Sequence, residues 1–136
     1  MKILIVDDER VVSDFFAQLA RVRGYTDVDT VSTGEEALTQ VIRTDYDLIT
    51  LDIQMPGVSG LEIIAMLRNM CPHAILALIS GYIPEEVSSE VAGCADVMIP
   101  KPVGVDTFTR LLEGVEQIHQ ARERIRSLGI PPSACR

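Results

Sequence analysis

The sequence lacks any long hydrophobic run. No apolar stretch approaches the roughly 18 residues of a membrane-spanning helix, although hydrophobic residues make up 47% of the 136-residue chain. The first apolar run, Ile3–Val6, follows a single lysine and is too short for the core of a signal peptide. Low-complexity segments are absent as well. We therefore expect a globular cytoplasmic protein with no membrane contact.

The chain also lacks an excess of positive charge and a metal-binding pattern of cysteines. Its formal net charge is −8, which argues against direct nucleic-acid binding. Cys71, Cys94 and Cys135 are odd in number and share no metal-ligand spacing. His73 and His119 each stand alone in the sequence. We expect these cysteines to be buried or incidental thiols in a reducing compartment.

What the chain does contain is an alternation of short apolar runs with helical patterns. The length suits one domain, and the alternation predicts an α/β fold with repeated βα units around a parallel sheet. The expected strands are Ile3–Val6, Val28–Val31, Leu48–Leu51, Ala74–Ile79 and Asp96–Ile99. We expect the domain to cover residues 1–121, followed by a helix extension and short tail over residues 122–136.

Several helix ends can be predicted from capping residues. Thr33 is a plausible N-cap, and Pro84 suits the first position of a later helix. The last helix is expected to end at Gly129. One apolar stripe is predicted along it, formed by Val105, Phe108, Leu111, Leu112, Val115 and Ile118 and continued by Ala121, Ile125 and Leu128.

Polar and charged residues follow four of the predicted strands. The first is followed by Asp7-Asp8-Glu9, the third by Asp52, the fourth by Ser80 and the fifth, after Pro100, by Lys101. In a parallel sheet these positions share one edge, where open α/β sheets place their chemistry. Clustered carboxylates repel one another and need a counter-charge. A hard divalent cation such as Mg²⁺, with Lys101, fits that need. Together these groups suggest attack by a carboxylate on phosphorus.

Four sequence blocks carry a resemblance to a known family. "ILIVDDE", "LITLDIQMPGVSGLE", "LISGY" and "VMIPKP" occur in the order and approximate spacing of the receiver domains of bacterial two-component response regulators, the superfamily of the chemotaxis regulators. The resemblance covers about the first 120 residues. It implies a (βα)5, flavodoxin-like fold with a doubly wound parallel sheet of strand order 2-1-3-4-5.

The resemblance also implies a role for each site residue. Asp52 would accept a phosphoryl group from the phosphohistidine of a histidine kinase or phosphotransfer protein. Asp8, Asp52 and the backbone carbonyl of Gln54 would bind Mg²⁺ or Mn²⁺, with Asp7 acting through water. Lys101 would contact the phosphoryl group. The protein would be a stoichiometric phosphoacceptor that catalyses its own phosphorylation and dephosphorylation, not an enzyme acting on an external substrate.

Switching is expected to involve the hydroxyl of Ser80, which would move toward the phosphoryl group, and the adjoining Gly81 and Tyr82. The family usually has an aromatic residue three positions before the lysine, whereas this chain has Met98. Pro102 would follow a cis peptide bond.

Partners are implied by the same resemblance. An output protein or domain would bind the face made by the fourth helix, fifth strand and last helix. A phosphorylation-dependent homodimer is a further expectation.

Other classes of protein remain open from the residues alone. A receiver-like adaptor would bind partners without phosphorylation. A haloacid-dehalogenase-type phosphohydrolase also uses a strand-end aspartate, but it requires a second aspartate two residues later, where this chain has Gln54. A flavodoxin-type cofactor binder requires a phosphate-binding loop after the first strand, and the acidic "DDERV" disfavours it.

Overall fold

Five parallel strands form one sheet in the order β2-β1-β3-β4-β5, as the resemblance predicted. The computed structural model describes residues 1–55, 57, 60–81 and 89–130. The strands are β1 (Lys2–Val6), β2 (Asp27–Val31), β3 (Leu48–Leu51), β4 (Ile75–Ser80) and β5 (Val97–Pro100). The helices are α1 (Arg10–Val22), α2 (Gly34–Arg43), α3 (Gly60–Met70), α4 (Ser89–Cys94) and α5 (Val105–Arg126).

The strand register places the functional residues on one edge of the sheet. Val6 of β1 is aligned with Leu51 of β3, and Leu51 with Leu78 of β4. Ser80, which ends β4, is aligned with Pro100, which ends β5. The residues that follow β1, β3 and β5 therefore emerge beside one another, as is usual for ligand sites in doubly wound sheets.

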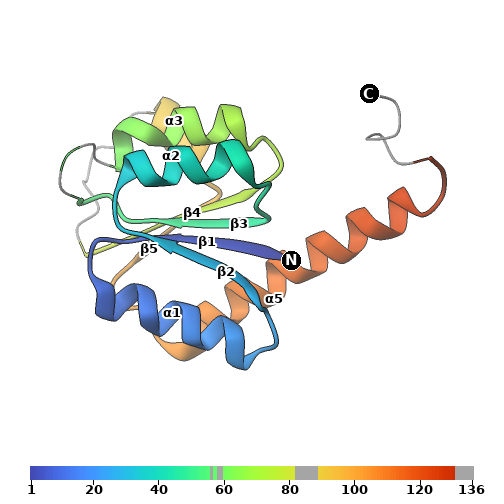
Figure 1. The fold of residues 1–136 in the computed structure, drawn as a ribbon, viewed down its shortest axis with the longest axis horizontal. Helices are drawn as coiled ribbons and strands as arrows, with labels where there is room; N and C mark the ends of the chain where they lie inside the picture. The colour runs from blue at the N-terminus through green and yellow to red at the C-terminus, as the bar shows by residue number, and fades with distance from the viewer. Residues whose placement is uncertain (56, 58–59, 82–88, 131–136) are drawn as a thin grey trace.

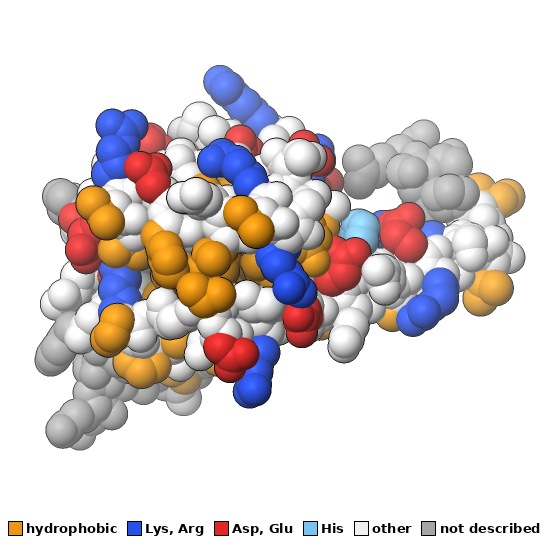
Figure 2. Space-filling model, turned by 90° about the horizontal axis from the view of Figure 1, so that it is seen from below, with side chains coloured by type: hydrophobic (Ala, Val, Ile, Leu, Met, Phe, Trp, Pro, Cys, Tyr) orange, Lys and Arg blue, Asp and Glu red, His pale blue; other side chains and the backbone are white. Residues whose placement is uncertain are grey.

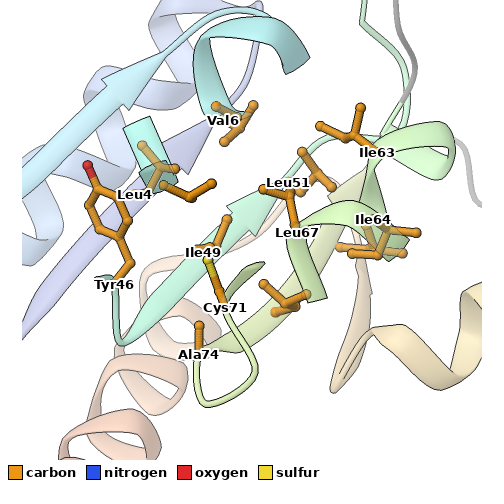
Figure 3. Packing of buried hydrophobic residues seen from close by; sticks show 14 of the residues in the cluster. Leu4, Val6, Tyr46, Ile49, Leu51, Ile63, Ile64, Leu67, Cys71 and Ala74 are labelled. Carbon is orange, nitrogen blue, oxygen red and sulfur yellow. The ribbon is translucent and has the colours of Figure 1, made fainter. Parts of the chain in front are cut away.

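Helices cover both faces of the sheet, with α1 and α5 on one face and α2, α3 and α4 on the other (Figure 1). Alternate residues of β1 pack in the two core clusters on opposite faces of the sheet, because successive side chains of a strand point to opposite faces. Leu4 and Val6 pack in the cluster beneath α2 and α3 (Figure 3), whereas Ile3 and Ile5 pack with α1 and α5. Burial of both faces explains why β1, β3 and β4 are almost continuously apolar.

The predicted N-cap of α2 is confirmed. The hydroxyl of Thr33 accepts a hydrogen bond from the backbone N–H of Glu36 at 3.2 Å. The Glu36 carboxylate in turn accepts from the backbone N–H of Ser32 at 3.4 Å. The helix start expected at Pro84 lies outside the described residues.

Arg68 of α3 fixes the C-terminal end of α4 and the N-terminal end of β5. Its guanidinium donates to the carbonyl oxygens of Cys94 and Ala74, each at 3.0 Å, and of Pro72 at 3.2 Å. It also forms an ion pair with Asp96 at 2.9 Å. The end of α4 remote from the functional edge is therefore held by several bonds at once.

The apolar stripe expected along α5 is buried only where the helix lies against the sheet. Phe108, Leu112 and Val115 are buried against the sheet. Ile125 and Leu128 are 68% and 86% exposed. Figure 1 shows the second half of α5 continuing past the edge of the sheet, where it has no core to pack against.

Among the described helices, none combines the length and apolarity needed to cross a bilayer.

Candidate functional site

Three aspartates meet at the carboxyl edge of the sheet. Asp7 and Asp8 follow β1, and Asp52 follows β3. One carboxylate oxygen from each lies within 4.8 Å of the others. Asp7 and Asp52 are only 4% and 3% exposed, whereas Asp8 is exposed. The predicted carboxylate cluster therefore forms, with two members buried and one open to solvent.

Lys101 reaches into this cluster from the end of β5. Its ammonium nitrogen lies 2.8 Å from Asp7 Oδ2, 3.2 Å from Asp52 Oδ2 and 3.3 Å from Glu9 Oε1. Its backbone N–H donates to the carbonyl oxygen of Ser80 at 2.9 Å, which ties the lysine to the end of β4. Sequence analysis did not anticipate Glu9 as a partner of Lys101; its position beside the two aspartates was the available signal.

The electrostatics follow from burial and from Lys101. Burial raises the pKa of Asp7 above its usual value, although hydrogen bonds from Lys101 and from the backbone of Glu9 act in the opposite direction. Burial alone would lower the pKa of Lys101, but the hydrogen bond and charge of Asp7, together with Asp52, raise it above its usual value. The lysine is therefore fully protonated at neutral pH.

The loop after β3 holds Asp52 through backbone contacts. Asp52 Oδ1 accepts a hydrogen bond from the backbone N–H of Gln54 at 3.0 Å. Gly60, the first residue of α3, lies directly on this backbone, and its N–H donates to the carbonyl of Ile53 at 3.1 Å. A Cβ atom at Gly60 would clash with the carbonyl oxygen of Asp52. Sequence analysis missed this requirement for a glycine. The second glycine of "MPGVSG" was visible, but its contact with the Asp52 backbone was not.

The residues expected to switch lie around this edge. Ser80 is fully buried at the end of β4, and a Cβ atom on the exposed Gly81 would meet nothing within 4 Å. Met98 is partly buried and packs against the core cluster beneath α2 and α3. The Lys101–Pro102 peptide is cis, as predicted. Tyr82 lies outside the described residues.

The chemistry of the donor set fits a hard divalent cation. Asp7, Asp8, Asp52 and Glu9 bring four carboxylates to one place, and Lys101 neutralises only one of these charges. Carboxylate oxygens are the ligands that Mg²⁺ prefers, commonly one or two of them with water and phosphate oxygens completing the shell. The site can therefore hold a cation and a phosphoryl group beside Asp52.

Comparison with known proteins places the chain in a family. A family model, the response regulator receiver domain, matches residues 3–116. The transcriptional regulatory protein TcrA of Mycobacterium tuberculosis is 32% identical over 114 residues, which cover 82% of this chain and 44% of TcrA. The chain belongs to the receiver domains of two-component response regulators, which are phosphoacceptors rather than turnover enzymes.

Solved structures agree with this assignment. The response regulator TrrA of Thermotoga maritima, determined with Mg²⁺-BeF, matches with a TM-score of 0.74 and 34% identity over 85% of this chain and 99% of TrrA. TrrA in complex with the histidine kinase ThkA matches with a TM-score of 0.73 and 33% identity, covering 85% of this chain and 98% of TrrA. The chain spans about half the length of the curated relatives it matches, 44% for TcrA and 52% for YvrH of Bacillus subtilis.

Proposed function

We propose that Asp52 accepts a phosphoryl group from the phosphohistidine of a sensor histidine kinase or phosphotransfer protein. A carboxylate oxygen of Asp52 would form the new P–O bond while the P–N bond to histidine breaks. The observation that carries this proposal is the buried carboxylate of Asp52, 3.2 Å from the Lys101 ammonium and next to two further aspartates. Lys101 would neutralise the transferred phosphoryl oxygens.

We propose that Mg²⁺, or Mn²⁺ in its place, binds through Asp8, Asp52 and the backbone carbonyl of Gln54, with Asp7 contributing through water. Lys101 lies closer to Asp7 than to Asp52, at 2.8 and 3.2 Å. The charge of Asp7 is thus the better neutralised, which leaves Asp8 and Asp52 to attract the cation. When bound, the cation supplies positive charge to the phosphoryl oxygens. Mg²⁺-BeF in the related TrrA supports this choice of ion.

The phosphorylated protein would hydrolyse its own acyl phosphate slowly and remain a stoichiometric switch. A turnover phosphohydrolase of the haloacid-dehalogenase type needs a second carboxylate two residues after the nucleophile, where it serves as an acid and base. Gln54 occupies that position, and its amide cannot perform this role.

The donor would dock on the face formed by α1 and α5. Figure 2 shows hydrophobic side chains gathered on this side of the molecule. Val11, Phe15 and Val22 of α1 are 83%, 40% and 77% exposed. Because α1 begins just after Asp8 and Glu9, a kinase helix on this face would stand next to the phosphoacceptor. The complex of TrrA with its kinase ThkA supports a partner of this class.

Output would use the face made by α4, β5 and α5. Phosphorylation would draw Ser80 toward Asp52, and Gly81 and Tyr82 would follow, because glycine permits large backbone changes. Met98 would repack rather than turn as a ring. A homodimer that forms on phosphorylation would use the same face. Arg68 fixes the C-terminal end of α4. The movement of α4 would therefore be largest at its other end, near Ser80.

We further propose that the receiver unit ends near residue 121, with residues 122–136 as a helix extension and tail of a cytoplasmic protein. The family match ends at residue 116, and α5 continues without interruption to Arg126. The free thiol of Cys71 agrees with a reducing compartment.

Incubation with acetyl phosphate and Mg²⁺ tests the function. We expect intact-mass spectrometry to show one added phosphoryl group, lost on chelation and in Asp52→Asn. Asp14→Asn, a change at an exposed aspartate of α1, serves as the matched control and should be labelled normally. A receiver-like adaptor would remain unlabelled throughout, and equal labelling of Asp52→Asn would contradict the assignment.

A further inference from the structure

Glu9 is a third carboxylate on Lys101, beside the two aspartates that the proposed function uses. Its Oε1 atom lies 3.3 Å from the Lys101 ammonium nitrogen, compared with 2.8 Å for Asp7 and 3.2 Å for Asp52. An ammonium group has three N–H donors. The three carboxylates therefore engage all of the N–H donors of Lys101 and leave none for a phosphoryl oxygen.

The start of α1 does not explain this contact. Glu9 is the N-cap residue of the helix, but its side chain makes no capping hydrogen bond. Serine, threonine, aspartate and asparagine are the side chains that cap a helix well. A carboxylate at this end also favours the helix dipole without any need for a cation. The Glu9 side chain is instead directed to Lys101, which is 92 residues away in the chain.

The three carboxylates differ in how easily they can release Lys101. The side chains of Asp7 and Asp52 are only 3% and 4% exposed, so the loss of Lys101 would leave a buried charge without its partner. The side chain of Glu9 is 62% exposed, and its carboxylate can turn into water at little cost. Glu9 is therefore the partner that an incoming anion displaces.

Phosphorylation of Asp52 requires such a release. While Asp52 attacks, its carboxylate still carries charge, and Lys101 has to neutralise the phosphoryl oxygens at the same time. The side chain of Lys101 is only 13% exposed, which leaves little room for a further acceptor. A phosphoryl oxygen would thus take the N–H group that Glu9 gives up. The Glu9 carboxylate also repels an anionic phosphodonor as it approaches.

We propose that Glu9 is a positioning residue that acts through Lys101 and restrains phosphorylation by small anionic phosphodonors such as acyl phosphates. In the resting protein it holds the ammonium group of Lys101. A phosphodonor has to displace Glu9 before Lys101 can contact the transferred oxygens. This inference rests on the proposed role of Asp52 and adds a residue that slows the same reaction.

The rate of phosphorylation by acetyl phosphate, with Mg²⁺ saturating for each variant, tests this proposal. Glu9→Gln keeps the size of the side chain and removes its charge. We expect it to raise the apparent second-order rate constant about fivefold at low ionic strength, the factor that corresponds to the upper end of an exposed ion pair. Asp14→Asn removes another exposed carboxylate, within α1, and should change the rate by less than about twofold.

Ionic strength separates this electrostatic role from a structural one. Because salt screens exposed charges, the ratio of the Glu9→Gln rate to the wild-type rate should fall to about twofold or less in about 0.5 M salt. A ratio that does not change with salt would overturn the proposal, and so would a Glu9→Gln variant slower than the wild type.

The same measurement distinguishes failure of this inference from failure of the proposed function. Equal rates for the wild type and Glu9→Gln would overturn the role of Glu9 and leave that of Asp52 intact. A wild type that is not phosphorylated at all would overturn both.

Discussion

The ammonium nitrogen of Lys101 lies 3.2 Å from a carboxylate oxygen of Asp52, although 49 residues separate them in the chain. The pairing follows from topology, because β3 and β5 both end at the carboxyl edge of the sheet with only β4 between them. The same lysine contacts Asp7 at 2.8 Å. One cation thus holds together two buried carboxylates from different strands.

Removing the ammonium group of Lys101 should destabilise the protein. Lys101→Met leaves Asp7 and Asp52 buried without their counter-charge, and we expect a loss of about 2–3 kcal/mol in the free energy of unfolding, near the lower end for a broken buried ion pair because the site opens to solvent at Asp8. Urea unfolding without metal measures it. Lys2→Met, at the other and exposed lysine of the chain, should have little effect. Equal stabilities for the two variants would contradict the electrostatic role of Lys101.

Metal affinity should distinguish the two aspartates that follow β1. We expect Asp8→Asn to weaken Mg²⁺ binding more than Asp7→Asn, since Asp8 is the proposed direct ligand and Asp7 is already paired with Lys101. Isothermal titration of both variants measures the difference. Equal losses of affinity would mean that the two aspartates share one role.

The sequence predicted most of what depends on chain order and residue pattern. Alternating runs placed the five strands to within about a residue at either end, and Thr33 marked the start of α2. The acidic strand ends placed Asp7 and Asp52 together without any coordinates, since parallel strands share an edge.

Contacts between distant elements could not be predicted in this way. The contact of His119 Nδ1 with Asp47 Oδ1 joins residues 72 positions apart, and no local pattern specifies it. The apolar residues of α5 had the right period, but the pattern does not tell where the sheet ends beneath the helix. Ile125 and Leu128 are therefore exposed rather than buried.

Gly60 provides a test of close packing beside Asp52. We expect Gly60→Ala to destabilise the protein by about 1–3 kcal/mol, because the added Cβ atom would clash with the Asp52 carbonyl, and to slow phosphorylation by displacing the loop. Gly114→Ala, at an open helical position, should instead stabilise by up to about 1 kcal/mol. Thermal unfolding of both variants decides this; a neutral Gly60→Ala would show that the loop yields easily.

The hydroxyl of Tyr46 should make stability sensitive to alkaline pH. It is buried and donates to Asp29 Oδ2 at 2.6 Å. Burial, followed by the hydrogen bond and charge of Asp29, raises its pKa above the usual value of 10.0. A raised folded-state pKa gives stability that is complete below the unfolded pKa and is lost as pH rises toward the folded value.

Tyr46→Phe should therefore lower the free energy of unfolding by about 0.5–1.5 kcal/mol at pH 7, the usual net value of one hydrogen bond. Its stability should then fall less steeply than that of the wild type above about pH 10. Urea unfolding from pH 7 to 11 measures both effects. Parallel pH profiles would show that the Tyr46 hydroxyl does not carry the linkage.

The most direct test of the proposed role of Asp52 is to locate the phosphoryl group on the chain. An acyl phosphate on aspartate is reduced by borohydride to homoserine, which tandem mass spectrometry can assign to a single residue. After phosphorylation with acetyl phosphate and Mg²⁺, we expect homoserine at position 52 and an unmodified carboxylate at Asp7 and Asp8. Homoserine at either of those positions, with Asp52 unchanged, would contradict the account.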